Sequence, residues 1–185
     1  IETTNVNAGR LDYVYGNGED DILFGGLFGD TIDAGQGTNI VFGDHGVVDY
    51  VIDDGQLDDI DILESTAWDI GGSDTIVTGD GDDIVIGGTN DLGIPETINA
   101  GAGDNNIVFG DNGRILSAFS VDNTVADLAD SLDDHPITLG RIETIAPNDG
   151  GDDTITTGVG RDIILAGAGL DTIVANDGED LLSGT

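Results

Sequence analysis

The stretch TGVGRDIIL (157–165), AGAGLDTIV (166–174), ANDGEDLLS (175–183) consists of three nine-residue units that follow one another without a gap. Each unit has an aspartate at its sixth position and an aliphatic residue two positions later. Glycine stands two residues before each aspartate, and Gly or Asn stands four before it, residue types that tolerate tight or left-handed backbone. A fixed short period indicates a chain built by stacking one small unit.

The same period extends through much of the chain. The repeated acidic or amide positions are Asp12, Asp21, Asp30, Asn39, Asp74, Asp83, Asp153, Asp162, Asp171 and Asp180. Their aliphatic partners are Val14, Leu23, Ile32, Val41, Ile76, Val85, Ile155, Ile164, Ile173 and Leu182, which we predict to form the core. A unit has room for roughly six residues of turn and three of strand. Because the strand is so short, the chain must turn again at once, and two units form one lap of a flattened coil.

The composition predicts a thin core that needs another source of stability. The 185 residues include nine aromatic side chains, no Met and no Cys, so disulfides are excluded. The formal net charge is −34, from 32 Asp and 6 Glu against four Arg. Aspartate in such excess is typical of turns and of oxygen ligands for hard cations. Without a basic patch, nucleic acid is excluded as a partner.

No sequence signal places the chain in a membrane or marks its ends as complete. There is no apolar run long enough to form a transmembrane span, and the first ten residues lack the features of a signal peptide. Gly184 and Thr185 resemble the opening of another unit. We therefore expect the parent protein to continue beyond this chain.

The repeats resemble a known family. TGDGDDIVI (78–86), followed by Gly87 and Gly88, resembles the RTX (repeats-in-toxin) nonapeptide GGxGxDxUx. The resemblance implies an all-β fold, a right-handed parallel β-roll (β-solenoid) with the aliphatic residue inward and calcium held between the turns of neighbouring laps. Arg10, Glu19 and Phe28 depart from the pattern, because the family has glycine at these places.

Calcium suits the chemistry of these turns. It takes six to eight oxygen ligands and accepts both carboxylates and carbonyls, which a glycine-rich turn can direct toward one point. Since one lap takes eighteen residues, the spacing predicts that Asp153 lies beside Asp171, Asp162 beside Asp180 and Asp12 beside Asp30. The predicted ligands of several Ca2+ ions are Asp12, Asp21, Asp30, Asp74, Gly79, Gly81, Asp83, Gly101, Gly103, Asn105, Gly151, Asp153, Gly158, Gly160, Asp162, Gly167, Gly169, Asp171, Gly178 and Asp180.

Two inserts interrupt what we predict to be a single roll over residues 1–185. They occupy 47–70 and 114–147 and have matched ends, since IVFGDHG (40–46) resembles IVFGDNG (107–113). Matched ends around variable middles indicate projecting hairpins or loops, and TVADLADSLDD (124–134) predicts a short helix in the second. A third interruption, LGIP (92–95), only lengthens one turn. Asp44 and Asp111 lie in the matched ends, where calcium binding and simple turn chemistry both remain open.

The sequence favours a structural or interaction module over an enzyme. It contains no HExxH, no GxSxG, no phosphate loop and no cysteine nucleophile. The resemblance implies a calcium-folded part of a secreted or cell-surface bacterial protein, exported unfolded by a type I system. One alternative is a module of an exported enzyme or toxin whose catalytic domain lies elsewhere.

Another alternative is an ice- or carbohydrate-binding solenoid. This would need ranks of Thr or aromatic residues on a flat face. Thr154 and Thr156 form one such pair, but we expect the neighbouring laps not to repeat the pair. The inserts could contact a protein or glycan partner. The oligomeric state stays open.

Overall fold

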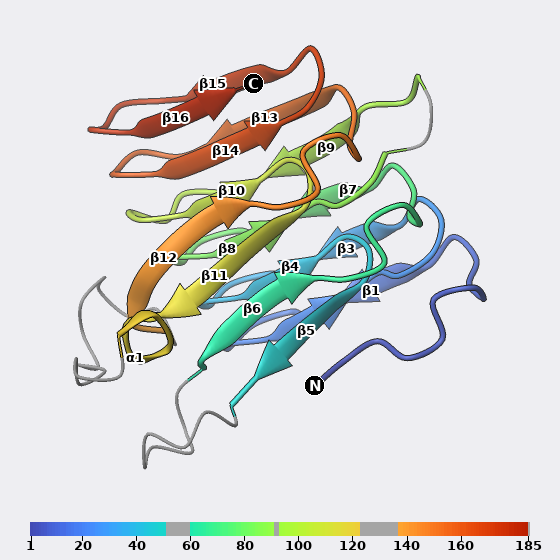
Figure 1. The fold of residues 1–185 in the computed structure, drawn as a ribbon. Helices are drawn as coiled ribbons and strands as arrows, with labels where there is room; N and C mark the ends of the chain where they lie inside the picture. The colour runs from blue at the N-terminus through green and yellow to red at the C-terminus, as the bar shows by residue number, and fades with distance from the viewer. Residues whose placement is uncertain (51–59, 91–92, 123–136, 185) are drawn as a thin grey trace.

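A computed structural model describes residues 1–50, 60–90, 93–122 and 137–184. These residues form a parallel β-roll of six laps, as predicted, with a four-stranded antiparallel sheet beside it (Figure 1). The two ends of the chain lie at opposite ends of the stack.

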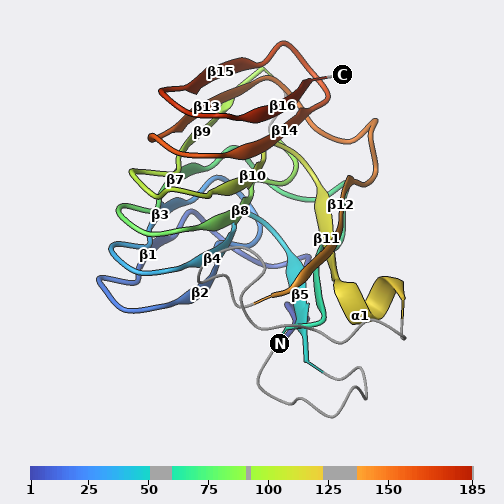
Figure 2. The same ribbon diagram turned by 90° about the vertical axis from the view of Figure 1, so that its left-hand side faces the viewer.

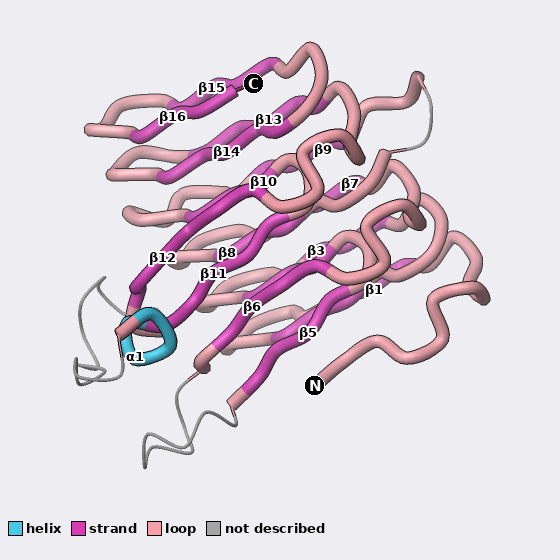
Figure 3. The backbone as a smooth tube through the Cα atoms, in the orientation of Figure 1, coloured by secondary structure: helices cyan, strands magenta, loops and turns pink. Residues whose placement is uncertain are grey.

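Two six-stranded parallel sheets form the walls of the roll. The first roll sheet contains β1 (Tyr13–Tyr15), β3 (Thr31–Asp33), β7 (Thr75–Val77), β9 (Glu96–Asn99), β13 (Asp153–Thr157) and β15 (Thr172–Ala175). The second roll sheet contains β2 (Ile22–Phe24), β4 (Ile40–Phe42), β8 (Ile84–Ile86), β10 (Ile107–Phe109), β14 (Ile163–Gly167) and β16 (Leu181–Gly184). Strands that are neighbours in a sheet belong to successive laps, so each lap pairs with the next along its whole length (Figure 3).

The inside of the roll is a narrow aliphatic core. The central residue of each short strand points inward, because side chains alternate along a strand. Ile32, Val41, Ile76, Val85 and Ile155 are fully buried there, as the repeat predicted. The prediction is wrong for Leu182, which lies in the edge strand β16 and is 49% exposed.

Turn geometry explains why glycine usually stands two residues before the aspartate of a repeat. Gly81, Gly160 and Gly169 all have positive φ there, between +129° and +132°. Glu19 and Phe28 occupy the same position and also have positive φ, at 70° and 76°. A side chain in this conformation is strained, so these two turns follow the repeat geometry at a cost of about 1 kcal/mol each.

The hairpin sheet comes from the two interrupted stretches. It contains β5 (Gly46–Asp49), β6 (Ile62–Ser65), β11 (Gly113–Ser117) and β12 (Leu139–Thr144), and a short helix α1 (Ala118–Val121) follows β11. β5 pairs with β6 and β11 with β12, both antiparallel, and β6 pairs with β11. The two hairpins therefore share one sheet although they are far apart in sequence. The helix expected over 124–134 lies outside the described residues.

The hairpin sheet covers the outer face of the second roll sheet, which makes the molecule three layers thick (Figure 2). The second roll sheet carries apolar residues on both faces, and Phe42 and Phe109 are buried against Val48, Leu63 and Ile115 of the hairpin sheet. This second core adds larger side chains than the inside of the roll can hold. It also fixes the hairpins against the laps from which they leave.

Candidate metal centre

Two ladders of polar side chains run along the roll, one at each edge where the chain turns between the sheets. The first ladder consists of Asp12, Asp30, Asp74, Glu96, Asp153 and Asp171, at or just before the strands of the first roll sheet. The second ladder consists of Asp21, Asn39, Asp83, Asn106, Asp162 and Asp180, just before the strands of the second. Every lap thus contributes one residue to each ladder.

Hydrogen bonds join successive members of the ladders. In the first, the backbone N–H of Asp12 donates to Oδ1 of Asp30 at 2.6 Å, and that of Asp153 donates to Oδ1 of Asp171 at 3.1 Å. In the second, the N–H of Asp162 donates to Oδ1 of Asp180 at 3.1 Å. The three pairs expected from the eighteen-residue lap are therefore brought together. Bonds of the same kind join laps across the inserts, where the partners are 44 or 56 residues apart.

The structure changes the assignment of two ladder positions. The residue equivalent to these aspartates in the fourth lap is Asn106 and not Asn105, because the N–H of Asp83 donates to Oδ1 of Asn106 and the N–H of Asn106 donates to Oδ1 of Asp162. Asn105 binds the side chain of Asp82 instead. Glu96 was missed, although Ile98 follows it at the spacing found in every repeat.

One oxygen of many ladder carboxylates is buried without a hydrogen-bond donor. Among the described residues this holds for Oδ2 of Asp21, Asp30, Asp153 and Asp162 and for both carboxylate oxygens of Glu96. A carboxylate has only acceptor atoms, so burial without a donor or a cation is costly. The ion pairs of the described residues all join Arg114 or Arg141 to glutamates of the hairpin sheet, so arginine does not neutralise these oxygens.

Backbone carbonyls of the next lap face the same places. A Cβ added at Gly43 would lie 2.3 Å from Oδ2 of Asp74 and 2.4 Å from the carbonyl oxygen of Gly87. At Gly110 the equivalent distances, to Oδ2 of Asp153 and the carbonyl oxygen of Ala166, are 2.3 and 2.4 Å. Only glycine leaves room for both oxygens. A mixed set of carboxylate and carbonyl oxygens is the donor set that calcium prefers.

The predicted glycines also stack from lap to lap. Each of eight faces a carbonyl oxygen of the neighbouring lap, namely Gly79, Gly81, Gly101, Gly103, Gly158, Gly160, Gly169 and Gly178. Gly151 lies instead against the side chain of Asn90, and Gly167 against Oδ2 of Asp111. The turns thus form columns of carbonyl groups beside the ladders.

Burial raises the pKa values of the enclosed carboxyl groups. Desolvation raises the pKa of Asp30 to about 6, of Asp83 to about 7 and of Asp153 to about 8, although backbone or side-chain hydrogen bonds oppose the shift. The pKa of Glu96 lies well above its usual value, first because of burial and then because of the nearby charge of Asp74. With a pKa of about 8, Asp153 would mostly hold a proton at pH 7 without a cation, so a cation that binds there must displace that proton.

Asp44 and Asp111 lie where the two hairpins leave the roll. Asp44 accepts hydrogen bonds from the N–H groups of Gly72, at 3.0 Å, and Thr89, at 2.6 Å. Asp111 accepts equivalent bonds from Gly151 and Ala168. Desolvation raises the pKa of Asp44 to about 9 and that of Asp111 to about 7. Both residues therefore join the root of a hairpin to neighbouring laps through backbone N–H groups, and both are buried.

Comparison with known families points to the same residues. The model of the RTX calcium-binding nonapeptide repeat matches residues 12–46, 70–91 and 148–182, in four copies. These ranges hold ten of the twelve ladder positions, all except Glu96 and Asn106. No curated protein and no solved structure matches the chain. None of the helices described is long and apolar enough to cross a membrane.

Proposed function

The chain belongs to the RTX calcium-binding nonapeptide-repeat family, whose repeats bind calcium, and from this premise we propose that calcium folds it into a structural module of a secreted or cell-surface bacterial protein. The observation that carries the proposal is the row of buried, donorless carboxylate oxygens along both ladders. Calcium satisfies such oxygens and cancels their charge at the same time.

The residues fit the ion in number and in chemistry. The ladder carboxylates, such as Asp153 and Asp162, would supply charged ligands, and the carbonyls of the stacked glycines would complete each shell. Bound calcium would supply positive charge between laps and no reaction chemistry. Each ion would then link two laps that are otherwise held by short strands and small side chains.

Electrostatics makes folding depend on the ion. Two unit charges 4 Å apart repel by about 1 kcal/mol in water and by about 4 kcal/mol near a protein surface. The ladders bring acidic residues of successive laps together, and the chain carries a formal charge of −34. Calcium at a hundredfold excess over its dissociation constant stabilises the folded state by about 2.7 kcal/mol per independent site. The stabilisation from a few sites is therefore as large as the whole free energy of unfolding of an ordinary domain, about 5–15 kcal/mol.

Calcium titration followed by circular dichroism tests the proposal. We expect the chain to be largely unfolded in EDTA and to gain β structure cooperatively as calcium is added. A protein that is equally ordered in EDTA would refute the proposal. Calcium is scarce in the cytosol and abundant outside the cell, so this behaviour would keep the chain unfolded during export and fold it afterwards. RTX repeats occur in secreted bacterial proteins, which supports this location.

The repeats themselves are a structural module and not a catalytic one. An activity of the parent protein would then come from another part of it, and the hairpin sheet is the part of this module best suited to contact a protein or glycan. Removing residues 114–147 tests this role if the shortened protein still folds with calcium.

One observation favours a second candidate, binding to ice or to carbohydrate. The strand register of the first roll sheet aligns Thr31, Thr75, Thr97, Thr154 and Thr172 in one outward-facing row. The pair of Thr154 with Thr156 is not repeated, as expected, because Asn99 and Val174 lie beside Thr156, and only Thr154 continues in the row. A regular row on a flat, open sheet is a surface for an ordered ligand. Partition of the calcium-bound protein into growing ice, and its binding to a glycan array, test this candidate, and Thr97→Lys should abolish either activity.

A further inference from the structure

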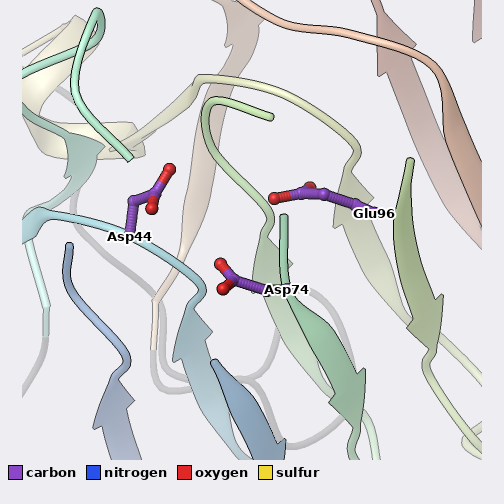
Figure 4. A group of neighbouring side chains, drawn as sticks. All are labelled: Asp44, Asp74 and Glu96. Atoms are coloured by element: carbon purple, nitrogen blue, oxygen red, sulfur yellow. The ribbon is translucent and has the colours of Figure 1, made fainter. Parts of the chain in front are cut away.

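Three carboxylates meet at the place where the first hairpin leaves the roll. Asp44 follows β4, Asp74 precedes β7 and Glu96 begins β9, so they come from three successive laps. One oxygen from each lies within 4.8 Å of the others (Figure 4). All three side chains are buried, with exposed fractions of 4%, 1% and 0%.

Glu96 is the unusual member of the group. The aspartates of its ladder, such as Asp171, turn one oxygen toward the backbone N–H of the neighbouring lap. Among the described residues, neither carboxylate oxygen of Glu96 has a hydrogen-bond partner, although the side chain is fully buried. Its extra methylene carries the carboxylate past the ladder toward Asp44 and Asp74 (Figure 4). A Cβ on Gly87 would lie only 2.0 Å from Oε2 of Glu96, so glycine leaves the room that this carboxylate needs.

Hydrogen bonds fix the other two members in place. Asp44 is held by the N–H groups of Gly72 and Thr89, and Oδ1 of Asp74 accepts the N–H of Asp30 at 2.6 Å. Within the described residues, arginine pairs only with glutamates of the hairpin sheet and lies at none of these carboxylates. The group therefore presents three preorganised acidic ligands that no arginine of the described residues neutralises.

We propose that Asp44, Asp74 and Glu96 bind a divalent cation of the calcium type at the root of the first hairpin. Buried carboxylates require a positive partner, and an all-oxygen site selects a hard ion. The proposal extends the calcium-dependent fold to a site outside the nonapeptide pattern, because Glu96 lies beyond the matched residues and Asp44 is not a ladder residue. Through Asp44 and its bond to Gly72, the ion ties both ends of the hairpin to the lap that begins with Glu96.

The root of the second hairpin lacks this site. At the second root, Asp111 is equivalent to Asp44, and Asp153 is equivalent to Asp74. The position equivalent to Glu96 is occupied by the shorter Asp171. Oδ1 of Asp171 accepts the N–H of Asp153. In the described part of the chain, only the group with the longer Glu96 side chain gathers three ligand atoms. The site is therefore a property of the first hairpin.

Counting bound ions tests the proposal. Native mass spectrometry of the calcium-loaded protein should show one ion fewer in Glu96→Gln than in the wild type, because the amide keeps the shape and removes the charge. Glu2→Gln, at an exposed position, is the matched control and should bind as many ions as the wild type. Equal ion counts in Glu96→Gln and the wild type, or an equal loss in Glu2→Gln, would overturn the assignment.

If Glu96→Gln fails to fold, anomalous diffraction from calcium-soaked wild-type crystals tests the site instead. A peak within about 2.6 Å of oxygens from all three residues supports the site. The absence of an anomalous peak among these oxygens overturns the proposed site. Failure here is distinct from failure of the proposed function, which would show as a wild-type protein that needs no calcium to fold.

Discussion

Replacing Asp162 by alanine should weaken the calcium-dependent fold more than any substitution on the outer face of the roll. Asp162 is 1% exposed, and its Oδ1 accepts both the backbone N–H of Asn106, at 2.9 Å, and the side-chain amide of Asn106, at 3.1 Å. Alanine would leave the buried N–H without an acceptor, at a cost of about 1–3 kcal/mol. It would also remove one of the ligands that we propose for calcium, and loss of one site at a hundredfold excess of calcium costs about 2.7 kcal/mol. We expect a total of roughly 4–6 kcal/mol.

The calcium midpoint of folding converts this energy into a measurement. If about six ions bind as the chain folds, a loss of 4–6 kcal/mol raises the midpoint roughly three- to fivefold. Asp162→Asn separates the two contributions, because Asn39 and Asn106 already act as acceptors at equivalent positions of the ladder. Its midpoint should lie between those of the wild type and Asp162→Ala.

Asp33→Ala is the matched control for this series. Asp33 belongs to β3, and its exposed side chain points away from the core. Circular dichroism at increasing calcium should give a midpoint for Asp33→Ala close to that of the wild type. Equal shifts in Asp33→Ala and Asp162→Ala would refute the reasoning, since the net charge removed is the same and only the ladder position differs.

Three further predictions concern pH, ion choice and the second core. Burial raises the pKa of Asp153 to about 8 and of Asp44 to about 9, above the unfolded values, so protonation stabilises the metal-free fold. This contribution is complete below about pH 4 and is lost as the pH rises through about 8 to 9; circular dichroism in EDTA should therefore show less β structure at pH 9 than at pH 5, and a flat profile would contradict the shifts. Magnesium should restore less β structure than calcium at equal concentration, because it demands a tighter octahedral shell, and equal recovery in circular dichroism would argue against these oxygen sets. Phe109→Ala should cost about 3–5 kcal/mol in urea denaturation at saturating calcium, because Phe109 is fully buried under the hairpin sheet, whereas Tyr13→Ala, 65% exposed, should cost less than 1 kcal/mol.

The nine-residue period was sufficient to predict the roll, its lap length and most ladder positions. The pattern of Asp followed two residues later by an aliphatic side chain specifies both the strand and its inward face, and so Asp153 could be paired with Asp171 by counting. Counting failed only in the fourth lap, where Glu96 was missed and Asn105 was chosen in place of Asn106. The spacing from Asp83 to its partner Asn106 is 23 residues and not the 18 of a regular lap, so counting could not find it.

The third layer was harder to predict because it depends on contacts between distant segments. The second roll sheet has apolar residues at all three positions of its strands, as in Ile40, Val41 and Phe42. The first roll sheet has polar residues such as Thr75 at its outer positions. That difference indicates a covered face, but the sequence does not say what covers it. Pairing of β6 with β11 joins segments about fifty residues apart and has no local signal.

The shared sheet has a mechanical consequence. Because β6 pairs with β11, the hairpin sheet braces the laps between the two hairpins along one side, whereas the strands of the first and last laps are edge strands that pair with one neighbour each. A pull applied along the stack should therefore peel the outer coils one by one at low force. The laps joined by the hairpin sheet should then unfold together in a single larger step. A force–extension trace would record a series of small unfolding events followed by one large event.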